Sequence, residues 1–236
     1  MSRLLTFVLC IAVLAGALNP QVPLGQRHDV RLMDYAVNRI AVIGDSYTTG
    51  DDSYTTADKE GENGATGWPT QAWRALTRHG IAVTPTVAAE DGAGYSTHGE
   101  RGNTFEDLTV LAVKPSDVLV VFFGSRNDRD VDPTPLSIAM FGTFKLARQI
   151  ARSAKFLVIG PVWPTADPPP SIRRVRDVLE YQAALAEATF VDPIAGRWFV
   201  GRSDLIGPDG VQPNGAGHTY LAAKLAPLIG AQFNGY

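Results

Sequence analysis

The stretch Ile-Ala-Val-Ile-Gly-Asp-Ser at residues 40–46 decides the fold and also points to the site. Its first four residues form an apolar run, which is typical of a strand buried within a sheet. The three that follow, Gly44-Asp45-Ser46, are typical of a turn directly behind that strand. A serine in this position presents its hydroxyl at the exposed end of a buried strand, so Ser46 is a candidate nucleophile.

From here onward, apolar runs alternate with segments of helical pattern. The runs that predict strands are residues 39–43, 81–87, 117–123, 155–159 and 189–191. The segments that predict helices are residues 68–79, 104–113, 135–153, 171–188 and 214–229. Strands that alternate with helices indicate a mostly parallel sheet with helices on both faces. We therefore expect one α/β domain over residues 39–236, in which the polar, glycine-rich residues 50–67 form a long loop.

The first residues are typical of a secretory signal peptide. Met1-Ser2-Arg3 supplies a positive start, residues 4–14 are apolar, and Ala15-Gly16-Ala17 matches the small residues of a cleavage site. The apolar run is shorter than the roughly 20 residues that a membrane-spanning helix needs. We therefore expect a signal peptide over residues 1–17, with a retained anchor as the alternative, and a lead-in segment over residues 18–38. After cleavage the protein would be secreted or associated with the cell envelope, without a stable membrane span.

Charge and cysteine content argue against several function classes. The chain has 21 Lys and Arg against 24 Asp and Glu, a net charge of −3, so no basic field exists to attract nucleic acid. The single cysteine, Cys10, lies within the signal peptide, so the mature protein would have neither disulfides nor thiolate metal ligands. Asp128, Asp130 and Asp132 have a spacing that occurs in calcium loops but lack the rest of that pattern. We interpret them as a solvated loop and expect no metal and no cofactor.

Three further segments carry polar residues to the same edge of the predicted sheet. Residues 91–96, Asp-Gly-Ala-Gly-Tyr-Ser, follow the second predicted strand, and residues 124–128, Gly-Ser-Arg-Asn-Asp, follow the third. Residues 209–214, Asp-Gly-Val-Gln-Pro-Asn, precede the last predicted helix. Sites in open α/β sheets gather outside the carboxyl ends of the strands. We therefore expect these segments to meet Ser46 there.

The residue types suit the cleavage of an ester. A serine enzyme of this kind needs a hydroxyl nucleophile, a base, and donors aimed at the developing oxyanion. Ser46 could supply the hydroxyl and its own backbone N–H, Gly94 a second backbone N–H, and Asn127 a side-chain amide. The motif G-x-S-x-G of the α/β-hydrolases does not occur in the sequence.

Together these segments resemble the SGNH hydrolase superfamily, also called the GDSL esterase/lipase family, over about residues 38–230. Gly44-Asp45-Ser46 matches its first block, Gly94 its second, Gly124-x-x-Asn127-Asp128 its third, and residues 209–214 the frame Asp-x-x-His-Pro of its last block. The composition, rich in Ala, Gly, Arg and Val, is similar to that of actinobacterial exported members. The resemblance implies a flavodoxin-like three-layer α/β/α sandwich with a mostly parallel central sheet, the SGNH hydrolase fold.

The resemblance also implies an activity and a set of site residues. It implies the hydrolysis of carboxylic esters, of lipids or acylated glycans, without a cofactor. Ser46 would be the nucleophile, and Asp209 would orient the base. Ser46, Gly94 and Asn127 would form the oxyanion hole.

One position departs from the family pattern. The base should be a histidine three residues after Asp209, and Gln212 stands there. A side-chain amide cannot take up a proton near neutral pH, although it can keep hydrogen bonds to Asp209 or Ser46. His218, in the predicted last helix, is a candidate surrogate base; its other interpretation is a packing or surface residue.

The remaining histidines and one tryptophan complete the set of candidates. His98 follows the expected oxyanion loop and could line the pocket as a substrate-binding or catalytic residue. Trp163, within the proline-rich residues 161–170, is a candidate for substrate contact. His28 and His79 are most simply surface residues.

These observations support two main hypotheses. The first is an exported serine esterase that acts through an acyl-enzyme on Ser46. The second is a catalytically impaired pseudoenzyme, or an engineered base knockout, that binds an acyl or glycan ligand. Gln212 favours the second, whereas the intact Ser46, Gly94 and Asn127 favour the first. Acyl transfer to a sugar acceptor, with the same residues, is a third alternative.

Overall fold

The computed structural model describes residues 38–50, 54–55 and 67–233, all within a structural unit that spans residues 36–236. The expected signal peptide, the lead-in segment up to residue 37, Cys10 and His28 lie outside the described residues. The predictions for them stay predictions.

Strands and helices alternate along the described chain. The strands are β1 (Asn38–Gly44), β2 (Tyr54–Thr55), β3 (Val83–Glu90), β4 (Leu119–Phe123), β5 (Lys155–Ile159) and β6 (Thr189–Val191). The α-helices are α1 (Ser46–Thr49), α2 (Trp68–Arg78), α3 (Phe105–Ala112), α4 (Pro133–Ile150), α5 (Pro170–Leu185) and α6 (Gly215–Gly230). Two short 3-10 helices are η1 (Arg126–Asp130) and η2 (Ser203–Leu205).

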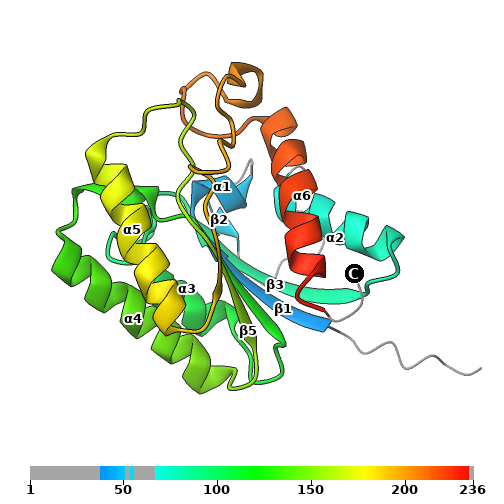
Figure 1. The fold of residues 1–236 in the computed structure, drawn as a ribbon. Helices are drawn as coiled ribbons and strands as arrows, with labels where there is room; N and C mark the ends of the chain where they lie inside the picture. The colour runs from blue at the N-terminus through cyan, green and yellow to red at the C-terminus, as the bar shows by residue number, and fades with distance from the viewer. Residues whose placement is uncertain (1–37, 51–53, 56–66, 234–236) are drawn as a thin grey trace, which may run out of the picture. The chain divides into compact units, whose positions relative to one another are not determined.

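The sheet has the strand order β2-β3-β1-β4-β5-β6. All neighbouring strands pair in parallel except β2, which is antiparallel to β3. Figure 1 shows α3, α4 and α5 on one face of the sheet and α2 and α6 on the other. The predicted three-layer α/β/α sandwich with a mostly parallel sheet is therefore confirmed.

Alternate residues of the central strands pack into two separate hydrophobic cores. In β1, Ala41 and Ile43 belong to the apolar cluster beneath α3, α4 and α5. Ile40 and Val42 belong to the cluster beneath α2 and α6. Successive side chains of a strand point to opposite faces, and a strand covered on both faces must be apolar throughout. This is why residues 40–43 include no polar residue.

The ends of several elements differ from the sequence prediction for identifiable reasons. β4 starts at Leu119 rather than at residue 117, because Asp117 accepts the backbone N–H of Lys114 (2.7 Å) and closes a turn. β3 continues to Glu90 and contains Pro85. Proline is tolerated there because β2 pairs with Ala89 and Glu90, and no strand of the described part of the chain lies along the outer side of Pro85.

The predicted helix starts are largely confirmed. Thr104 caps α3 in a capping box with Asp107, and Asn214 caps α6 by accepting the N–H of Gly217 (3.0 Å). The expected loop over residues 50–67 contains β2, and the rest of its interior lies outside the described residues.

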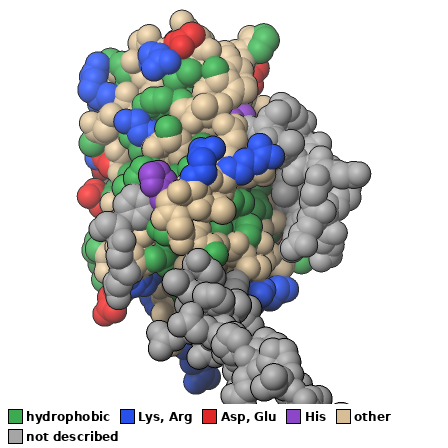
Figure 2. All heavy atoms as spheres, turned by 90° about the vertical axis from the view of Figure 1, so that its right-hand side faces the viewer, with side chains coloured by type: hydrophobic (Ala, Val, Ile, Leu, Met, Phe, Trp, Pro, Cys, Tyr) green, Lys and Arg blue, Asp and Glu red, His purple; other side chains and the backbone are tan. Residues whose placement is uncertain are grey.

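Two surface observations bear on function. Among the residues that the structure describes, no helix has both the length and the hydrophobicity needed to cross a membrane. On the side that carries α2 and α6, basic, polar and apolar side chains are interspersed (Figure 2).

Candidate active site

Ser46 lies where the first block turns from strand to helix. β1 ends at Gly44, and Asp45 caps the four-residue α1 by accepting the backbone N–H of Tyr47 (3.0 Å). Ser46 is the first residue of α1 and is partly exposed. The N–H groups of a first helical turn have no partner within the helix, so the Ser46 N–H is a suitable oxyanion donor.

The glycines of the first and third blocks are required by side chains that pack against them. A Cβ at position 44 would lie 2.2 Å from the hydroxyl oxygen of Thr48. Gly124 has a φ of +143°, and a Cβ there would lie 2.5 Å from a carboxylate oxygen of Asp45. Asp45 therefore joins the turn after β1 to the turn after β4 and holds the two blocks in contact.

Asp128 organises the loop that contains the second block. Its buried carboxylate accepts the backbone N–H groups of Tyr95, Ser96 and Thr97 (2.8, 3.0 and 2.9 Å) and the Thr97 hydroxyl (2.9 Å). Burial raises the pKa of Asp128, and these hydrogen bonds oppose the rise. The interpretation of Asp128 as part of a solvated loop was wrong, because it is a buried residue with a full set of donors; Asp130 and Asp132 are exposed.

The same contact explains Gly94. A Cβ at this position would lie 2.5 Å from the Asp128 carboxylate, so packing alone requires glycine here. The Gly94 N–H, expected as an oxyanion donor, donates instead to the Thr97 carbonyl (2.9 Å). Its part in oxyanion binding therefore stays a prediction that would require this bond to open.

Asn127 lies beside this loop. Its side-chain amide donates to the Ala93 carbonyl (2.8 Å), which fixes the amide next to the second block. A side-chain amide carries two N–H donors, so one more is offered by Asn127. The third block thus brings a donor to the edge of the sheet at which Ser46 lies.

The last block is tied to α1 through its backbone. The Tyr47 hydroxyl donates to the Val211 carbonyl (2.5 Å). The Asp209 carboxylate, which is exposed, accepts the backbone N–H groups of Val211 (3.0 Å) and Gln212 (3.1 Å). In this structure Asp209 therefore stabilises its own turn, the role that any aspartate in a tight turn can play.

Gln212 lies against a carboxylate that the sequence reasoning did not single out. Its side-chain amide contacts Asp91, whose pKa is raised by burial while hydrogen bonds from Thr49 and Gln212 oppose the rise. The Thr49 hydroxyl donates to Asp91 (2.8 Å) and is also 3.3 Å from the Ser46 carbonyl oxygen. Asp91 thus lies between the base position and the helix of Ser46. Its place at the end of β3 was the only signal in the sequence.

The electrostatics of the site depend on burial. Asp45 is buried, and this raises its pKa to about 7, against the opposing effects of the Tyr47 N–H and of Arg126. Burial likewise raises the pKa of the Tyr47 hydroxyl to about 12, with Arg126 opposing. A largely protonated Asp45 and a neutral Tyr47 therefore surround Ser46 at mildly acidic pH.

Comparisons with known proteins show the family of this chain. The family model described as "GDSL-like Lipase/Acylhydrolase family" matches residues 42–220, which is most of the chain. The chain belongs to this family. It is 50% identical over 240 residues, covering 100% of both chains, to a GDSL lipase of Mycobacterium tuberculosis.

Solved structures of low sequence identity share the fold. A lipase/acylhydrolase from Enterococcus faecalis matches with a TM-score of 0.60 at 16% identity and covers 83% of this chain and 97% of its own. Est24, a carbohydrate acetylesterase from Sinorhizobium meliloti, matches with a TM-score of 0.58 at 13% identity and covers 83% of this chain and 100% of its own. At these identities the likeness supports the SGNH fold alone.

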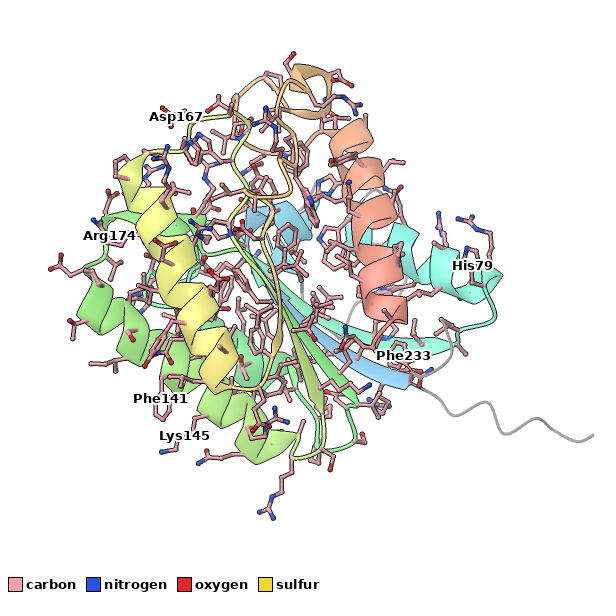
Figure 3. All side chains as sticks on the ribbon, in the orientation of Figure 1. His79, Phe141, Lys145, Asp167, Arg174 and Phe233 are labelled. Carbon is pink, nitrogen blue, oxygen red and sulfur yellow. The ribbon has the colours of Figure 1, made fainter. Side chains whose placement is uncertain are left out.

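The three histidines that the structure of this GDSL-like hydrolase describes lie in three different settings. His98 is exposed and interacts electrostatically with Asp107 at the start of α3. His218 is buried at the end of the first turn of α6, on the side of the helix that also buries Leu221. His79 is exposed at the end of α2 and points away from the sheet, as predicted (Figure 3).

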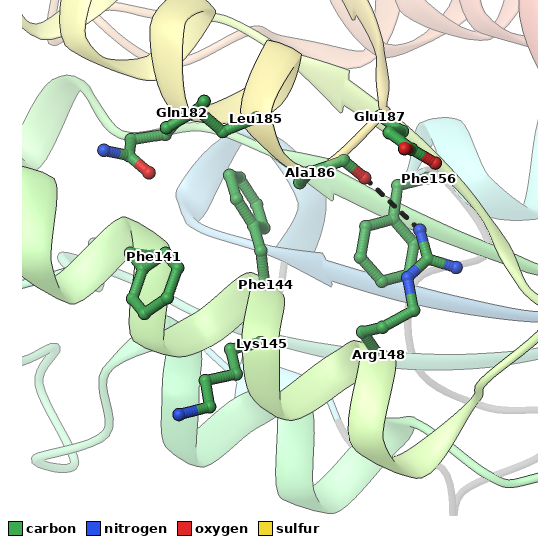
Figure 4. A pocket seen from close by; sticks show the side chains of 9 residues that line it. All are labelled: Phe141, Phe144, Lys145, Arg148, Phe156, Gln182, Leu185, Ala186 and Glu187. Atoms are coloured by element: carbon green, nitrogen blue, oxygen red, sulfur yellow. Dashed lines mark hydrogen bonds between the residues drawn. The ribbon is translucent and has the colours of Figure 1, made fainter.

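Two cavities lie at opposite ends of the sheet. One of about 570 Å³ lies between residues 164–166, directly after Trp163, and residues 199–210, directly before Gln212. The other, of about 280 Å³, lies between the later turns of α4 and α5, where Arg148 donates to the Ala186 carbonyl (Figure 4). The lining of the first includes Gly207 and Gly210, on either side of Asp209 in the sequence. Within the described residues no group of three or more His, Cys, Asp and Glu side chains could hold a metal ion.

Proposed function

We propose that this chain is an exported serine esterase that cleaves carboxylic esters of lipids or acylated glycans through an acyl-enzyme on Ser46. The observation that carries the proposal is the contact of Asp45 with Gly124, which joins the turn of Ser46 to the segment that holds Asn127. A nucleophile and an amide donor on joined turns suit attack on a carbonyl and stabilisation of the oxyanion.

In this mechanism the Ser46 hydroxyl attacks the ester carbonyl carbon, and its proton passes through solvent water to the oxygen of the departing alcohol. The Ser46 N–H and the Asn127 amide stabilise the tetrahedral oxyanion, the C–O bond to the alcohol breaks, and water then releases the acyl group. Gln212 occupies the position of the usual histidine, so the proton has no strong acceptor at that position. We therefore expect slow turnover, since removal of the catalytic histidine from the serine protease subtilisin lowers kcat by about 10⁶.

The cavity of about 570 Å³ supports a substrate with a sizeable acyl or alcohol group. Its lining starts at the residue after Trp163. Trp163 is half-buried, and its indole N–H donates to the Thr165 hydroxyl (3.0 Å). Volumes of several hundred Å³ are usual for sites that enclose small molecules.

The competing function is a pseudoenzyme that binds an acyl or glycan ligand without turnover. One observation favours it. The Gln212 side chain hydrogen-bonds Asp91, and the Asp209 carboxylate accepts a backbone N–H of its own turn. An amide that is fixed by hydrogen bonds at the position of the base is consistent with a pocket that binds a ligand without turnover.

The test compares wild type, Ser46→Ala and Gln212→His in the hydrolysis of p-nitrophenyl acetate and butyrate and in labelling by a fluorophosphonate. An esterase hydrolyses these esters above the Ser46→Ala background and is labelled at Ser46. A pseudoenzyme equals that background and gains activity only in Gln212→His. If neither wild type nor Gln212→His hydrolyses an ester or reacts with the probe, the esterase function is excluded.

Export is tested separately. Expression of the full chain in an actinobacterial host, followed by intact-mass analysis of the culture supernatant and envelope fractions, should find a chain that begins at Leu18. Recovery of the protein only from the cytoplasm, with Met1 retained, would contradict this proposal.

A further inference from the structure

Arg126 is a buried cation at the candidate site for which the esterase mechanism has no use. It follows Ser125, which has a φ of +90°, and it precedes Asn127 in the third block. Only 9% of Arg126 is exposed. Charged side chains are seldom buried to this extent without a specific partner.

Its neighbours place the guanidinium at the edge of the sheet at which Ser46 lies. The guanidinium carbon lies 5.2 Å from the ring centroid of Trp163, within the range of a cation–π contact. The guanidinium hydrogen-bonds the Tyr47 hydroxyl, and its charge also acts on the Asp45 carboxyl; these two residues flank Ser46 in the sequence. Arg126 therefore lies against Trp163 and close to the two residues that flank Ser46 in the sequence.

The nearby carboxyl groups do not fully neutralise the charge of Arg126. The Asp45 pKa of about 7 means that its carboxyl is only partly ionised at neutral pH. Asp128, the next residue but one, directs its carboxylate to four donors of the loop 95–97. The Nη1 atom of Arg126 is buried and has no hydrogen-bond partner among the residues that the structure describes.

From this geometry we infer that Arg126 binds an anionic oxygen group, a carboxylate or a phosphate, that the substrate carries next to the scissile ester. The inference rests on the proposed esterase function, since it names the substrate class of the same site. A guanidinium presents a planar set of N–H donors that fits a carboxylate or phosphate, and a low-dielectric surrounding strengthens that contact. Trp163, which is half-buried, packs against the guanidinium and restricts its orientation, and the small exposed fraction of Arg126 is the part that a ligand would reach first.

Matched esters test the inference. The alcohol-side set is 4-acetoxybenzoate, 4-acetoxyphenyl phosphate and the neutral methyl 4-acetoxybenzoate. The acyl-side pair is mono-p-nitrophenyl glutarate and p-nitrophenyl hexanoate. For each set, the ratio of kcat/KM for the anionic ester to that for the neutral ester is measured with Ser46→Ala as the blank.

We expect wild type to prefer the anionic ester in at least one set by about tenfold or more, and Arg126→Gln to lower that ratio by about 10- to 100-fold, the range of a charge-assisted hydrogen bond. Arg126→Lys keeps the charge but not the planar fork and should give an intermediate ratio. Arg129→Gln changes an exposed arginine of the same 3-10 helix and should leave the ratio as in wild type. The carboxylate and phosphate arms separate the two anion sources.

Two results overturn the inference. One is a wild-type enzyme that prefers the neutral ester in both sets, which needs no variant to be folded. The other is an Arg126→Lys or Arg126→Gln variant, folded by its melting curve, with an unchanged ratio, since a purely structural arginine would lower both rates together.

A failure of the proposed esterase function is recognised separately. If wild type hydrolyses no ester, calorimetry of Ser46→Ala with 4-acetoxybenzoate and its methyl ester still reports anion binding. Binding of the anionic ester that Arg126→Gln abolishes in the same background supports the inference without turnover. Equal affinity for both esters overturns it.

Discussion

At the scale of single residues, position 212 is where the sequence motif predicts that this chain departs from the pattern of its family. The Gln212 side chain contacts the carboxylate of Asp91, and its backbone N–H is held by Asp209. A histidine at this position would have two carboxylates within reach. Either could hold the imidazole in the tautomer that accepts a proton from Ser46.

Gln212→His should therefore raise kcat for p-nitrophenyl butyrate by about 10² or more, the usual contribution of a positioned general base. Only the neutral imidazole accepts a proton, so the activity should rise with pH through about 6.5 and level off above it. Initial rates between pH 5 and 8 give the profile. The double variant Ser46→Ala/Gln212→His is the control and should stay at the background; a pH-independent gain, or none, would contradict the prediction.

Asp45 predicts a pH dependence of stability. Its pKa is about 7 in the folded protein against 3.8 for an unperturbed carboxyl, so the folded state holds the proton more tightly. The folded protein therefore loses stability as the pH rises from about 4 to 7, and the loss is constant above that range. For a buried group this amounts to an order of 4 kcal/mol at most.

Asp45→Asn keeps the oxygen that caps α1 but cannot ionise. Relative to wild type, we expect its free energy of unfolding to increase between pH 4.5 and pH 7.5, as measured by urea denaturation at both values. The difference between the two proteins isolates Asp45 from the other buried carboxyls. An equal pH dependence in both would show that Asp45 is already ionised well below pH 7.

At the scale of elements, the strand-to-helix turns are fixed by contacts between a glycine and a carboxylate or hydroxyl. Gly124 meets Asp45, Gly94 meets Asp128, and Gly44 meets Thr48. Each contact joins a turn to a polar side chain of the same edge of the sheet. The site is thus assembled by packing of the turns before any substrate is present.

Gly124→Ala should destabilise the protein by about 2–4 kcal/mol and should lower fluorophosphonate labelling of Ser46. Its Cβ would lie 2.5 Å from Asp45 and 3.0 Å from the Phe105 ring at a φ of +143°. Gly80→Ala is the matched control, since Gly80 also has a positive φ (+79°) but no atom within 4 Å of the added Cβ. The control should lose only about 1 kcal/mol and keep its labelling.

At the scale of the whole molecule, the sheet separates two hydrophobic cores, one beneath α2 and α6 and one beneath α3, α4 and α5, and these cores have different roles. Phe123 packs against Tyr47 and Trp68 (ring centroids 6.1 and 6.0 Å apart) and so supports the helix of Ser46. Phe156 lies on the other face, against Phe122 and Phe144 (5.9 and 6.4 Å). Among the described residues, the core beneath α2 and α6 includes Tyr47 of α1, whereas the core beneath α3, α4 and α5 includes no residue of α1.

Phe123→Leu and Phe156→Leu should therefore separate stability from reactivity. We expect both variants to lose about 1–3 kcal/mol, because a smaller side chain leaves a partly collapsed gap. At a temperature at which both are folded, only Phe123→Leu should label more slowly with the fluorophosphonate. Equal labelling rates would mean that the core beneath α2 and α6 does not position Ser46.

Much of this architecture was predictable, because the buried strands are short continuous apolar runs. β5 and β6 were predicted to the residue, and the caps of α3 and α6 were predicted from Thr104 and Asn214. β2 could not be predicted, since a two-residue edge strand leaves no period in the sequence.

The candidate site was predicted in part. The segments of Ser46, Gly94 and Asn127 were expected at one edge of the sheet, and contacts through Asp45 and Asp128 join them there. Asp91 and Arg126 were missed as individual residues, because their importance depends on which distant side chains they meet. An isolated aspartate or arginine in a polar loop gives no sign of such neighbours.

The glycines of the first three blocks have an evolutionary consequence. Gly44, Gly94 and Gly124 are each demanded by a neighbouring side chain, so selection for a folded protein preserves them whether or not the protein turns over an ester. Histidine and glutamine codons differ by a single nucleotide, and Gln212 lies on a surface turn outside those contacts. On the proposed function, a single mutational step at position 212 would therefore change the activity and leave the architecture, with the glycines of the first three blocks, unchanged.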